Sequence, residues 1–395
     1  MRILVVQESD WLEKGPHQSH HLMERLSRRG HEVRVIDFEI QWTNHGKAGT
    51  FSRRKVFRDV HKAIEEGVIT VYRPGIVNLP VLDYVSLAIS HAIELRRQIR
   101  EFRPDVIVGF GILNARIAIA LAESKSIPFV YYVIDELHRL VPQGMFRGIA
   151  KQTEKNNMNN ATVVVSINEM LKEYTVAMGA KERNTLVIGA GVDLGKFDSA
   201  NDRERVRAEY GFGDTDIVLF YMGWLYTFSG MKEIATMLVT KPPAYRRIKL
   251  MIVGKGDLWA SLQDMKRQMA TDNTLVTLEW QPYDRIPSLI SASDICLLPA
   301  NKNDIMTNIV PIKIYEYMAA GKPIISTRFP GIVKEFGDNN GIIYVEKPEE
   351  VLQKANQLAS EGNLKALGMK AREFVRNNDW EKVTERFEGI LMGLK

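Results

Sequence analysis

The strongest constraint on the fold is a strand, a loop, a helix and a second strand that follow one another over residues 294–327. The first strand contains the run ICLL, which is apolar throughout and so suits a strand covered on both faces of a parallel sheet. The helix is expected over 311–320, because Pro311 suits a first turn and Gly321 with Pro323 suits an end. Two such strands joined by a helix run parallel, so this stretch predicts a βαβ unit.

The same alternation of strands and helices recurs along the chain. It opens with a strand at 1–7, a helix at 18–29 and a strand at 31–38, and it restarts with a strand at 216–222 after a polar stretch at 195–202. At 395 residues the chain is too long for one compact core. We therefore expect an α/β protein with two similar parallel-sheet domains.

The expected domain boundaries follow from this restart. An N-terminal domain takes residues 1–195, and a second domain takes residues 196–375. The last segment, 376–395, carries an amphipathic helix, which we expect to pack back towards the N-terminal domain. The expected buried stripe of this helix contains Trp380, Val383, Phe387, Ile390 and Leu391.

The composition excludes several classes of protein. With 45% hydrophobic and 26% charged residues, the chain has the balance of a soluble globular protein. Its one cysteine, Cys296, lies in an apolar strand, which excludes a disulfide framework and fits a reducing compartment. The start MRILVV is too short for a signal peptide, and no stretch approaches the ~20 apolar residues of a membrane span. No Cys/His spacing indicates zinc and no basic-aromatic run indicates nucleic acid, so we expect a cytoplasmic protein that binds neither.

Basic residues are concentrated in the N-terminal half. The net charge of +5 permits attraction to anionic lipids or substrates without requiring it. One cluster contains Arg53, Arg54, Lys55, Arg58 and Lys62, and another contains Arg96, Arg97, Arg100 and Arg103. A solvated face explains the first cluster more often than a ligand does, and cations near a helix C-terminus complement its dipole. We nevertheless expect this basic half to make a peripheral contact with the inner face of a membrane.

Candidate site residues in the N-terminal half follow predicted strands, because open α/β sheets bind ligands beyond the carboxyl ends of their strands. Gly15 lies in the loop after the first strand, where a turn or a ligand contact explains it equally simply. Asp135 and His138 follow the apolar run PFVYYVI. For His138, a structural role and a functional role are equally open. The first loop lacks the GxGxxG fingerprint, so a nicotinamide enzyme gains little support.

Candidate site residues in the C-terminal half have the same placement. Gly223 follows the strand that restarts the pattern, and Gly254 and Gly256 form a Gly-x-Gly loop after the next strand. Lys313 and Glu316 are three positions apart on the expected helix and so share a face. A lone carboxylate is often only a solvated helix residue, but its position after a strand and a polar loop favours a ligand site.

A series of short motifs resembles, in the correct order, those of one known family. They are GHEVRVI, PDVIV, GAGVDLGKF, GKG, ASDICLLPA and KIYEYMAAGKPIIST. With them the chain resembles a glycosyltransferase of the GT-B fold, in the large family 4 of retaining enzymes. The resemblance covers essentially the whole chain, and the run EYMAAGKP is its most specific part.

This resemblance implies two Rossmann-like, doubly wound domains that face a cleft. It implies transfer of a sugar, with retained configuration, from a nucleotide sugar to a lipid-linked, polysaccharide or glycan acceptor, without a metal or other cofactor. The donor is expected on the C-terminal domain, with Glu316 on its ribose hydroxyls and Asn308, Ile309 and Val310 beside it. Backbone N–H groups from Val310 to Lys313 then face the leaving diphosphate. A helix end contributes only ~0.3–1 kcal/mol, so cationic side chains must add to it.

The chain departs from the family pattern at several functional positions. Asn308 stands where the family has the first of two glutamates. Trp224 and Ser229 stand where it has a phosphate-binding Arg and Lys, and a family histidine after the strand PDVIV is missing. Lys313, Lys232 or Arg328 can replace the missing cations, and we favour Lys313. His138 or His17 can replace the histidine.

Two other functions fit these departures. The chain suits a GT-B-like binding or scaffolding subunit that has lost turnover, and detectable transfer by the purified protein excludes that role. A sugar-nucleotide epimerase of the same fold is the third possibility, and it requires an epimer to form from the nucleotide sugar alone.

Overall fold

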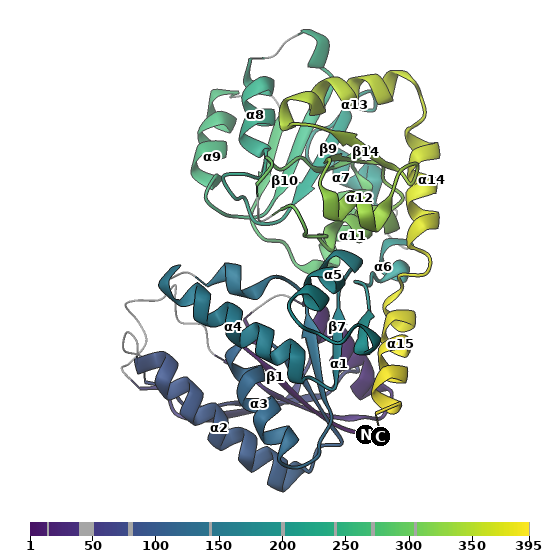
Figure 1. The fold of residues 1–395 in the computed structure, drawn as a ribbon. Coiled ribbons are helices and arrows are strands. Elements are labelled where there is room, and N and C mark those ends of the chain that lie inside the picture. Colours follow the sequence, from purple (N-terminus) through teal and green to yellow (C-terminus); the bar gives the residue numbers. More distant parts are fainter. Residues whose placement is uncertain are drawn as a thin grey trace. The chain divides into compact units, whose positions relative to one another are not determined.

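The computed structural model describes residues 1–13, 16–38, 51–77, 82–141, 144–198, 202–240, 243–269, 273–303 and 306–394. The chain divides into two compact units (Figure 1). Unit 1 consists of Met1–Ala190 and Trp380–Lys395, and unit 2 is Gly191–Asp379. The last helix thus belongs to unit 1, and the first boundary lies slightly before the expected residue 195.

Unit 1 is built on a mixed sheet that is parallel except at one edge. Over the described residues this sheet has eight strands in the order β3-β4-β2-β1-β5-β6-β7-β8, with β3 antiparallel to β4. The strands are β1 (Arg2–Gln7), β2 (Glu32–Ile36), β3 (Lys55–Val60), β4 (Ile69–Arg73), β5 (Val106–Phe110), β6 (Phe129–Val133), β7 (Val163–Ser166) and β8 (Thr185–Val187). The main helices are α1 (Gln18–Arg28), α2 (Leu82–Phe102), α3 (Leu113–Glu123), α4 (Gly144–Asn160), α5 (Glu169–Ala177) and α15 (Trp380–Met392).

Unit 2 is built on a fully parallel sheet. Over the described residues it has six strands in the order β11-β10-β9-β12-β13-β14, which is the doubly wound order of Rossmann folds. The strands are β9 (Ile217–Met222), β10 (Ile248–Val253), β11 (Leu275–Leu278), β12 (Ile295–Leu298), β13 (Ile324–Thr327) and β14 (Ile342–Val345). The helices are α6 (Leu194–Asp198), α7 (Arg203–Glu209), α8 (Met231–Val239), α9 (Trp259–Gln268), α10 (Ile286–Ser291), α11 (Lys313–Ala319), α12 (Pro330–Phe336), α13 (Val351–Ser360) and α14 (Leu364–Val375).

Helices cover both faces of each sheet, and the strand sequences reflect this. In β1, Ile3 and Val5 pack in one buried cluster while Leu4 and Val6 pack in another. Successive side chains of a strand point to opposite faces, so these two clusters are the two faces of one sheet. The predicted α/β architecture of two parallel-sheet domains is therefore confirmed.

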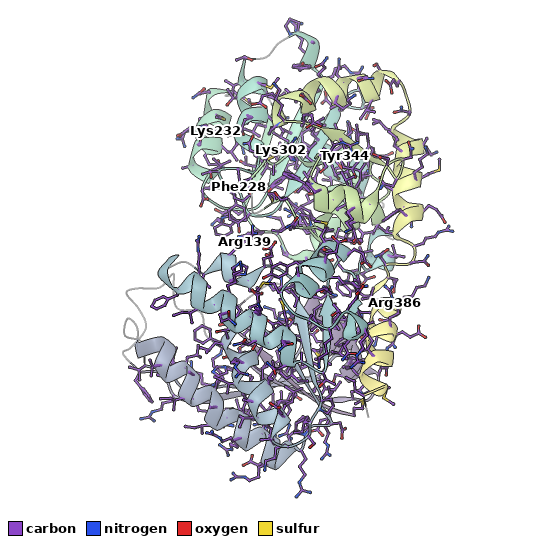
Figure 2. All side chains as sticks on the ribbon, viewed as in Figure 1. Arg139, Phe228, Lys232, Lys302, Tyr344 and Arg386 are labelled. Carbon is purple, nitrogen blue, oxygen red and sulfur yellow. The ribbon has the colours of Figure 1, made fainter. Side chains whose placement is uncertain are left out.

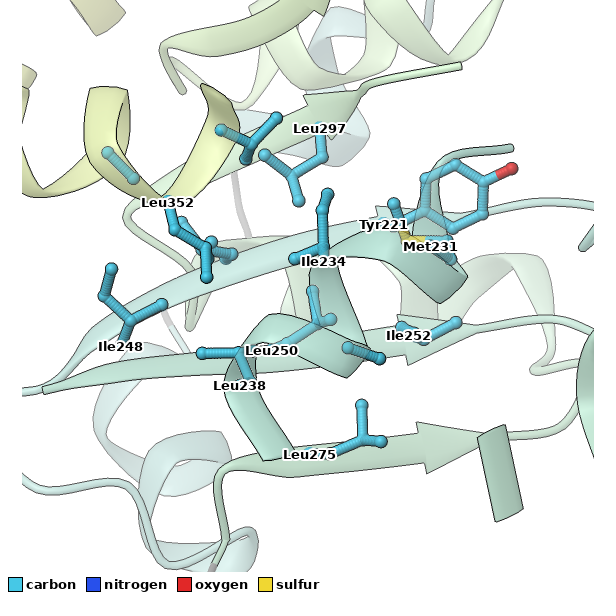
Figure 3. Packing of buried hydrophobic residues seen from close by; sticks show 14 of the residues in the cluster. Tyr221, Met231, Ile234, Leu238, Ile248, Leu250, Ile252, Leu275, Leu297 and Leu352 are labelled. Carbon is cyan, nitrogen blue, oxygen red and sulfur yellow. The ribbon is translucent and has the colours of Figure 1, made fainter. Parts of the chain in front are cut away.

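The core of unit 2 positions the carboxyl ends of its strands. Ile234 and Leu238 of α8 pack over Leu250 and Leu275 of the sheet (Figure 3). In the same view the hydroxyl of Tyr221 points away from the apolar cluster, beyond the end of β9 (Figure 3). The apolar packing thus ends where the loops after the strands begin.

The strand-helix-strand unit predicted at 294–327 is present, with a shorter helix than expected. Helix α11 begins at Lys313 and not at Pro311, because the carbonyls of Pro311 and Ile312 accept hydrogen bonds from Ile314 and Tyr315 and form a tighter turn ahead of it. Gly321 follows the helix with φ +64°, a conformation that suits glycine at a helix end.

The C-terminal helix α15 completes the core of unit 1. Trp380 stacks on His21 of α1 with ring centroids 4.2 Å apart. Arg25 of the same helix donates to Glu381 across 3.0 Å. The expected apolar stripe is largely buried, since Trp380, Val383, Phe387 and Leu391 belong to the same core cluster as β1 and Ile390 packs against it.

Candidate functional site

The sheet of unit 2 has a switch point between β9 and β12, neighbouring strands whose connections run to opposite sides. Ligands of doubly wound folds bind at the carboxyl edge of such a point. Gly223 follows β9 there, and Lys313 begins the helix that follows β12. A methyl group on Gly223 would lie 2.3 Å from Nζ of Lys313, and the φ of +135° at Gly223 also favours glycine. The glycine therefore lets the ammonium group approach the backbone closely.

Lys313 provides a partly desolvated cation at this point. Its Nζ lies 4.8 Å from the ring centroid of Tyr221. Among the described residues no carboxylate forms an ion pair with it. Burial lowers the pKa of Lys313 to about 8, against the opposing charge of Glu316. The side chain is thus mostly charged at neutral pH and loses its proton as the pH rises through about 8.

Glu316 provides a buried carboxyl one turn along the same helix. Its Oε1 accepts a hydrogen bond from the hydroxyl of Tyr283 across 2.9 Å. Burial raises the pKa of Glu316, while the bond from Tyr283 and the charge of Lys313 oppose that rise. An ionised carboxylate only accepts hydrogen bonds, so this group suits a ligand that offers hydroxyls.

Tyr283 is a member of this group that sequence reasoning missed. It lies in the short segment between β11 and α10, far from Glu316 in the sequence. No sequence motif marks a tyrosine in such a connecting segment as a site residue. Only the fold brings it to the helix.

Two glycines among the candidate site residues hold the loop after β9 in place. Leu225 donates to the carbonyl of Lys255 across 2.9 Å, so the loops after β9 and β10 run side by side. A Cβ atom on Gly254 would lie 2.0 Å from the carbonyl oxygen of Gly223, and one on Gly256 would lie 2.6 Å from the nitrogen of Leu225. Both glycines are therefore needed for this close approach of two backbones.

The stretch that contains Asn308, Ile309 and Val310 lies half-buried ahead of α11. The carbonyl of Thr307 accepts from the nitrogen of Gly331, and a Cβ atom on Gly331 would lie 2.8 Å from the carbonyl carbon of Asn308. The start of α12 therefore fixes this stretch in unit 2, the unit that also contains Lys313.

The other predicted residues lie in unit 1. Nδ1 of His138 lies 2.8 Å from Oε2 of Glu154, and the hydroxyl of Tyr174 donates to the same oxygen across 3.0 Å. Burial raises the pKa of Glu154, and the bonds from His138 and Tyr174 oppose that rise. The carboxyl and the stacked ring of Tyr174 fix the orientation of the imidazole. Sequence reasoning missed both partners, because each lies on a separate helix.

Asp135 bonds within its own loop rather than to the described members of that group. Oδ1 of Asp135 accepts from the backbone nitrogen of Glu136, the next residue, across 2.8 Å. Burial raises the pKa of Asp135, and the neighbouring charge of Glu136 adds to this rise. Gly15 lies outside the described residues.

The switch point of unit 1, between β1 and β5, is arranged differently. Glu8 follows β1, and its Oε1 accepts from the backbone nitrogen of Asn114 at the start of α3 across 2.7 Å. A Cβ atom on Gly111, after β5, would lie 2.9 Å from the carboxyl carbon of Glu8. Although part of its surface reaches solvent, the surrounding protein desolvates Glu8 and raises its pKa, and hydrogen bonds from the helix start oppose the rise.

The described part of the chain shows no sign of a membrane span or of a metal site. None of its helices combines the length and apolar character needed to cross a bilayer. No three metal-binding side chains of His, Cys, Asp or Glu lie together in it.

Comparison with family models gives two matches that together cover most of the chain. Residues 202–377 match the model described as glycosyl transferases group 1. Residues 18–196 match the model described as glycosyltransferase family 4. An uncharacterized glycosyltransferase of Methanocaldococcus jannaschii is 22% identical over 235 residues, 58% of each chain. The alignments with such curated relatives thus span less than two thirds of their length.

Solved structures with the same fold cover the whole chain. The Anabaena protein HepE in complex with UDP has a TM-score of 0.73 at 16% identity, with 100% of both chains covered. The same protein with UDP-glucose has a TM-score of 0.71 at 17% identity, again over 100% of both chains. Sucrose-phosphate synthase from Thermosynechococcus elongatus has a TM-score of 0.75 at 15% identity, with 100% of this chain and 99% of the other covered.

Proposed function

This chain belongs to the group 1, or family 4, glycosyltransferases of the GT-B fold, and we propose that it transfers a sugar from a nucleotide-sugar donor to a hydroxyl group of a lipid-linked, polysaccharide or glycan acceptor. The proposed reaction retains the anomeric configuration and needs no metal ion. UDP is the first nucleotide to test, because HepE was solved with UDP and with UDP-glucose.

One observation carries the proposal: an ammonium and a carboxyl group lie one turn apart at the switch point of unit 2. In the proposed complex Glu316 accepts hydrogen bonds from the two ribose hydroxyls, and Lys313 faces the diphosphate. Tyr283 holds one oxygen of Glu316 and so orients it. The lack of a side chain at Gly223 lets Nζ of Lys313 lie close to the backbone of the loop after β9.

The chemistry that these residues support is the departure of a nucleoside diphosphate. The bond between the anomeric carbon and the phosphate oxygen breaks, the acceptor oxygen bonds to that carbon, and the proton of the acceptor hydroxyl passes to the departing diphosphate. Negative charge then grows on the phosphate oxygens, where a preformed ammonium is most effective. Removing one such group from a water-poor site typically costs ~10²–10³ in rate.

The test is donor binding to Glu316→Ala by calorimetry, with UDP, GDP and ADP as the first probes. Loss of hydrogen bonds to a charged group is worth ~1.5–3 kcal/mol, so the nucleotide that binds best should bind about 10- to 100-fold more weakly. Glu349→Ala, an exposed glutamate in the same unit, is the matched control and should bind like the wild type. Equal affinities of wild type and Glu316→Ala would contradict the assignment.

A binding or scaffolding subunit is the second candidate, because Trp224 and Ser229 stand where the family has cations. Both candidates bind the nucleotide sugar, and only the enzyme turns it over. Release of free UDP from UDP-glucose, with or without an added acceptor, separates them. If the wild type releases UDP and Lys313→Met does not, the hypothesis of an inactive binding or scaffolding subunit is excluded.

We also propose that unit 1 contacts an anionic membrane through α2. Val85, Ile89 and Ile93 follow one another at every fourth position, and 52–59% of each is exposed. The exposed arginines 96, 97 and 100 continue along the helix. An apolar stripe next to cations suits the surface of an anionic bilayer.

Cosedimentation with phosphatidylglycerol vesicles tests this contact. We expect binding at low salt, little binding at high salt and little binding to phosphatidylcholine. Ile89→Ser/Ile93→Ser should bind less while melting at the same temperature. If the wild type stays in solution with anionic vesicles at low salt, the proposed contact is wrong.

A further inference from the structure

Exposed aromatic rings gather at the carboxyl edge of the sheet of unit 2. The exposed Trp224 and Tyr226 lie in the loop after β9 together with the half-buried Phe228, and the exposed Trp280 follows β11. The ring centroid of Trp224 lies 6.3 Å from that of Trp280 and 6.2 Å from that of Tyr226. The ring of Tyr226 stacks on that of Phe228, with centroids 4.9 Å apart. We call these four side chains the aromatic patch; Phe228 marks its place in Figure 2.

The aromatic patch is held in an exposed position by the loop beneath it. Leu225, between two of its members, is fully buried, and its backbone bonds to the neighbouring loop through Lys255 and Leu258. The hydroxyl of Tyr221 donates to the carbonyl of Trp224 across 3.0 Å. Trp224 and Tyr226 therefore point outward because Leu225 points inward.

The exposed area is large for residues of this type. Trp224, Tyr226 and Trp280 keep 45%, 47% and 54% of their surface exposed. Large aromatic side chains are normally buried, and a rigid cluster of exposed ones marks a binding surface. The aromatic patch is therefore better explained by a ligand than by folding.

The surroundings of the aromatic patch indicate which ligand chemistry it suits. Trp224 directly follows Gly223, which contacts Lys313, so the patch adjoins the proposed donor site. Lys255, in the neighbouring loop that accepts a hydrogen bond from Leu225, pairs with Glu279, the residue before Trp280, across 2.9 Å. Ring faces next to a paired Lys and Glu suit an uncharged ring with hydroxyl groups at its edge, rather than a phosphate.

We propose that the aromatic patch is a sugar-binding subsite that stacks against the ring of a pyranose. The pyranose is either the sugar of the donor or a sugar of the acceptor glycan, and the chemistry is the same for both. The donor alternative rests on the proposed function, whereas the glycan alternative does not. Stacking on the patch then supplies affinity where the family uses the cations that Trp224 and Ser229 replace.

The test compares wild type, Trp224→Ala/Trp280→Ala and Glu316→Ala, using UDP, UDP-glucose and an array of neutral glycans as probes. In the donor case, UDP-glucose binds the wild type more tightly than UDP does, and the double variant loses about tenfold for UDP-glucose only. In the glycan case, the wild type retains at least one neutral glycan on the array, and the double variant releases it. Either result supports the subsite.

Controls separate stacking from a loss of structure. Trp224→Phe/Trp280→Phe keeps flat rings and should retain most of the affinity that the alanine variant loses. Phe51→Ala removes an aromatic residue of unit 1 that is 63% exposed, and should bind every probe like the wild type. All variants should keep the melting temperature of the wild type.

Two results overturn the proposal. If the double variant loses UDP and UDP-glucose equally, the aromatic patch contacts the nucleobase and not a pyranose. If the double variant binds every probe as the wild type does, the patch is not a sugar subsite. The same conclusion follows if the wild type binds UDP-glucose no more tightly than UDP and retains no neutral glycan. Failure of the proposed function shows separately, as wild-type and Glu316→Ala proteins that bind UDP equally.

Discussion

The two switch points have the same topology and opposite chemistry. In unit 1 a residue after the first strand, Glu8, reaches the start of the helix after β5. In unit 2 the residue after β9 is Gly223, and the helix after β12 starts with a cation, Lys313. A glycine makes room in both places, for a carboxyl group in one unit and for an ammonium group in the other.

This difference shows how one fold provides a switch point filled by a carboxyl group of the chain and another that has a cation for a ligand. The start of α3 already has an acceptor for its backbone N–H groups, supplied by the chain itself. At the corresponding point of unit 2, no described carboxylate forms an ion pair with Lys313. A diphosphate is therefore expected at the switch point of unit 2 and not at that of unit 1.

The largest expected effect is that of Lys313→Met on sugar transfer. The substitution keeps an unbranched side chain and removes the charge, so the leaving phosphate loses its proposed cation. The rate of UDP release from UDP-glucose should fall ~10²–10³-fold, with a smaller change in the affinity for the donor. A variant that turns over at the wild-type rate would show that unit 2 does not depend on this charge.

The pH dependence of UDP binding sharpens the same prediction. The pKa of about 8 means that free Lys313 loses its charge as the pH rises through 8. A bound diphosphate favours the charged form, so affinity should be constant below pH 8 and fall above it, by no more than the factor that Lys313→Met costs at neutral pH. In Lys313→Met this fall should be absent. A fall of the same size in the variant would assign it to another group.

A smaller effect, on stability and not on binding, is expected for Glu8→Ala in unit 1. Without the carboxyl group the first N–H groups of α3 lose an acceptor, which costs ~1–3 kcal/mol. For a unit of this size that lowers the melting temperature by about 2–4 °C per kcal/mol. Glu8→Ala should bind UDP with the affinity of the wild type. The melting temperature of Glu8→Gln should lie between those of Glu8→Ala and the wild type. A loss of UDP affinity in Glu8→Ala would remove the distinction between the two switch points.

The parts of the fold that could be predicted are those with strong local patterns. The apolar run ICLL, the helix ahead of Gly321 and the restart at residue 216 correspond to β12, α11 and β9. The antiparallel pair of β3 and β4 was not predicted. The side chains of β3 are mostly exposed and two of them are basic, so its sequence lacks the alternation that marks a strand with one buried face.

The candidate site could be predicted only where sequence neighbours act together. Lys313 and Glu316 lie one turn apart, and helical spacing alone places them on one face. Tyr283 and Glu154 come from distant segments and were found only in the folded structure. The roles of Asn308 and the other donor contacts stay predictions.

The return of α15 to unit 1 sets an order for folding during synthesis. Trp380, Val383, Phe387 and Leu391 belong to the same core as β1. The ribosome makes every residue of unit 2 before it makes these four. Because domains fold as units, the core of unit 1 stays incomplete until α15 has been made, after all of unit 2. The first half of the chain to be made is therefore the last to be finished.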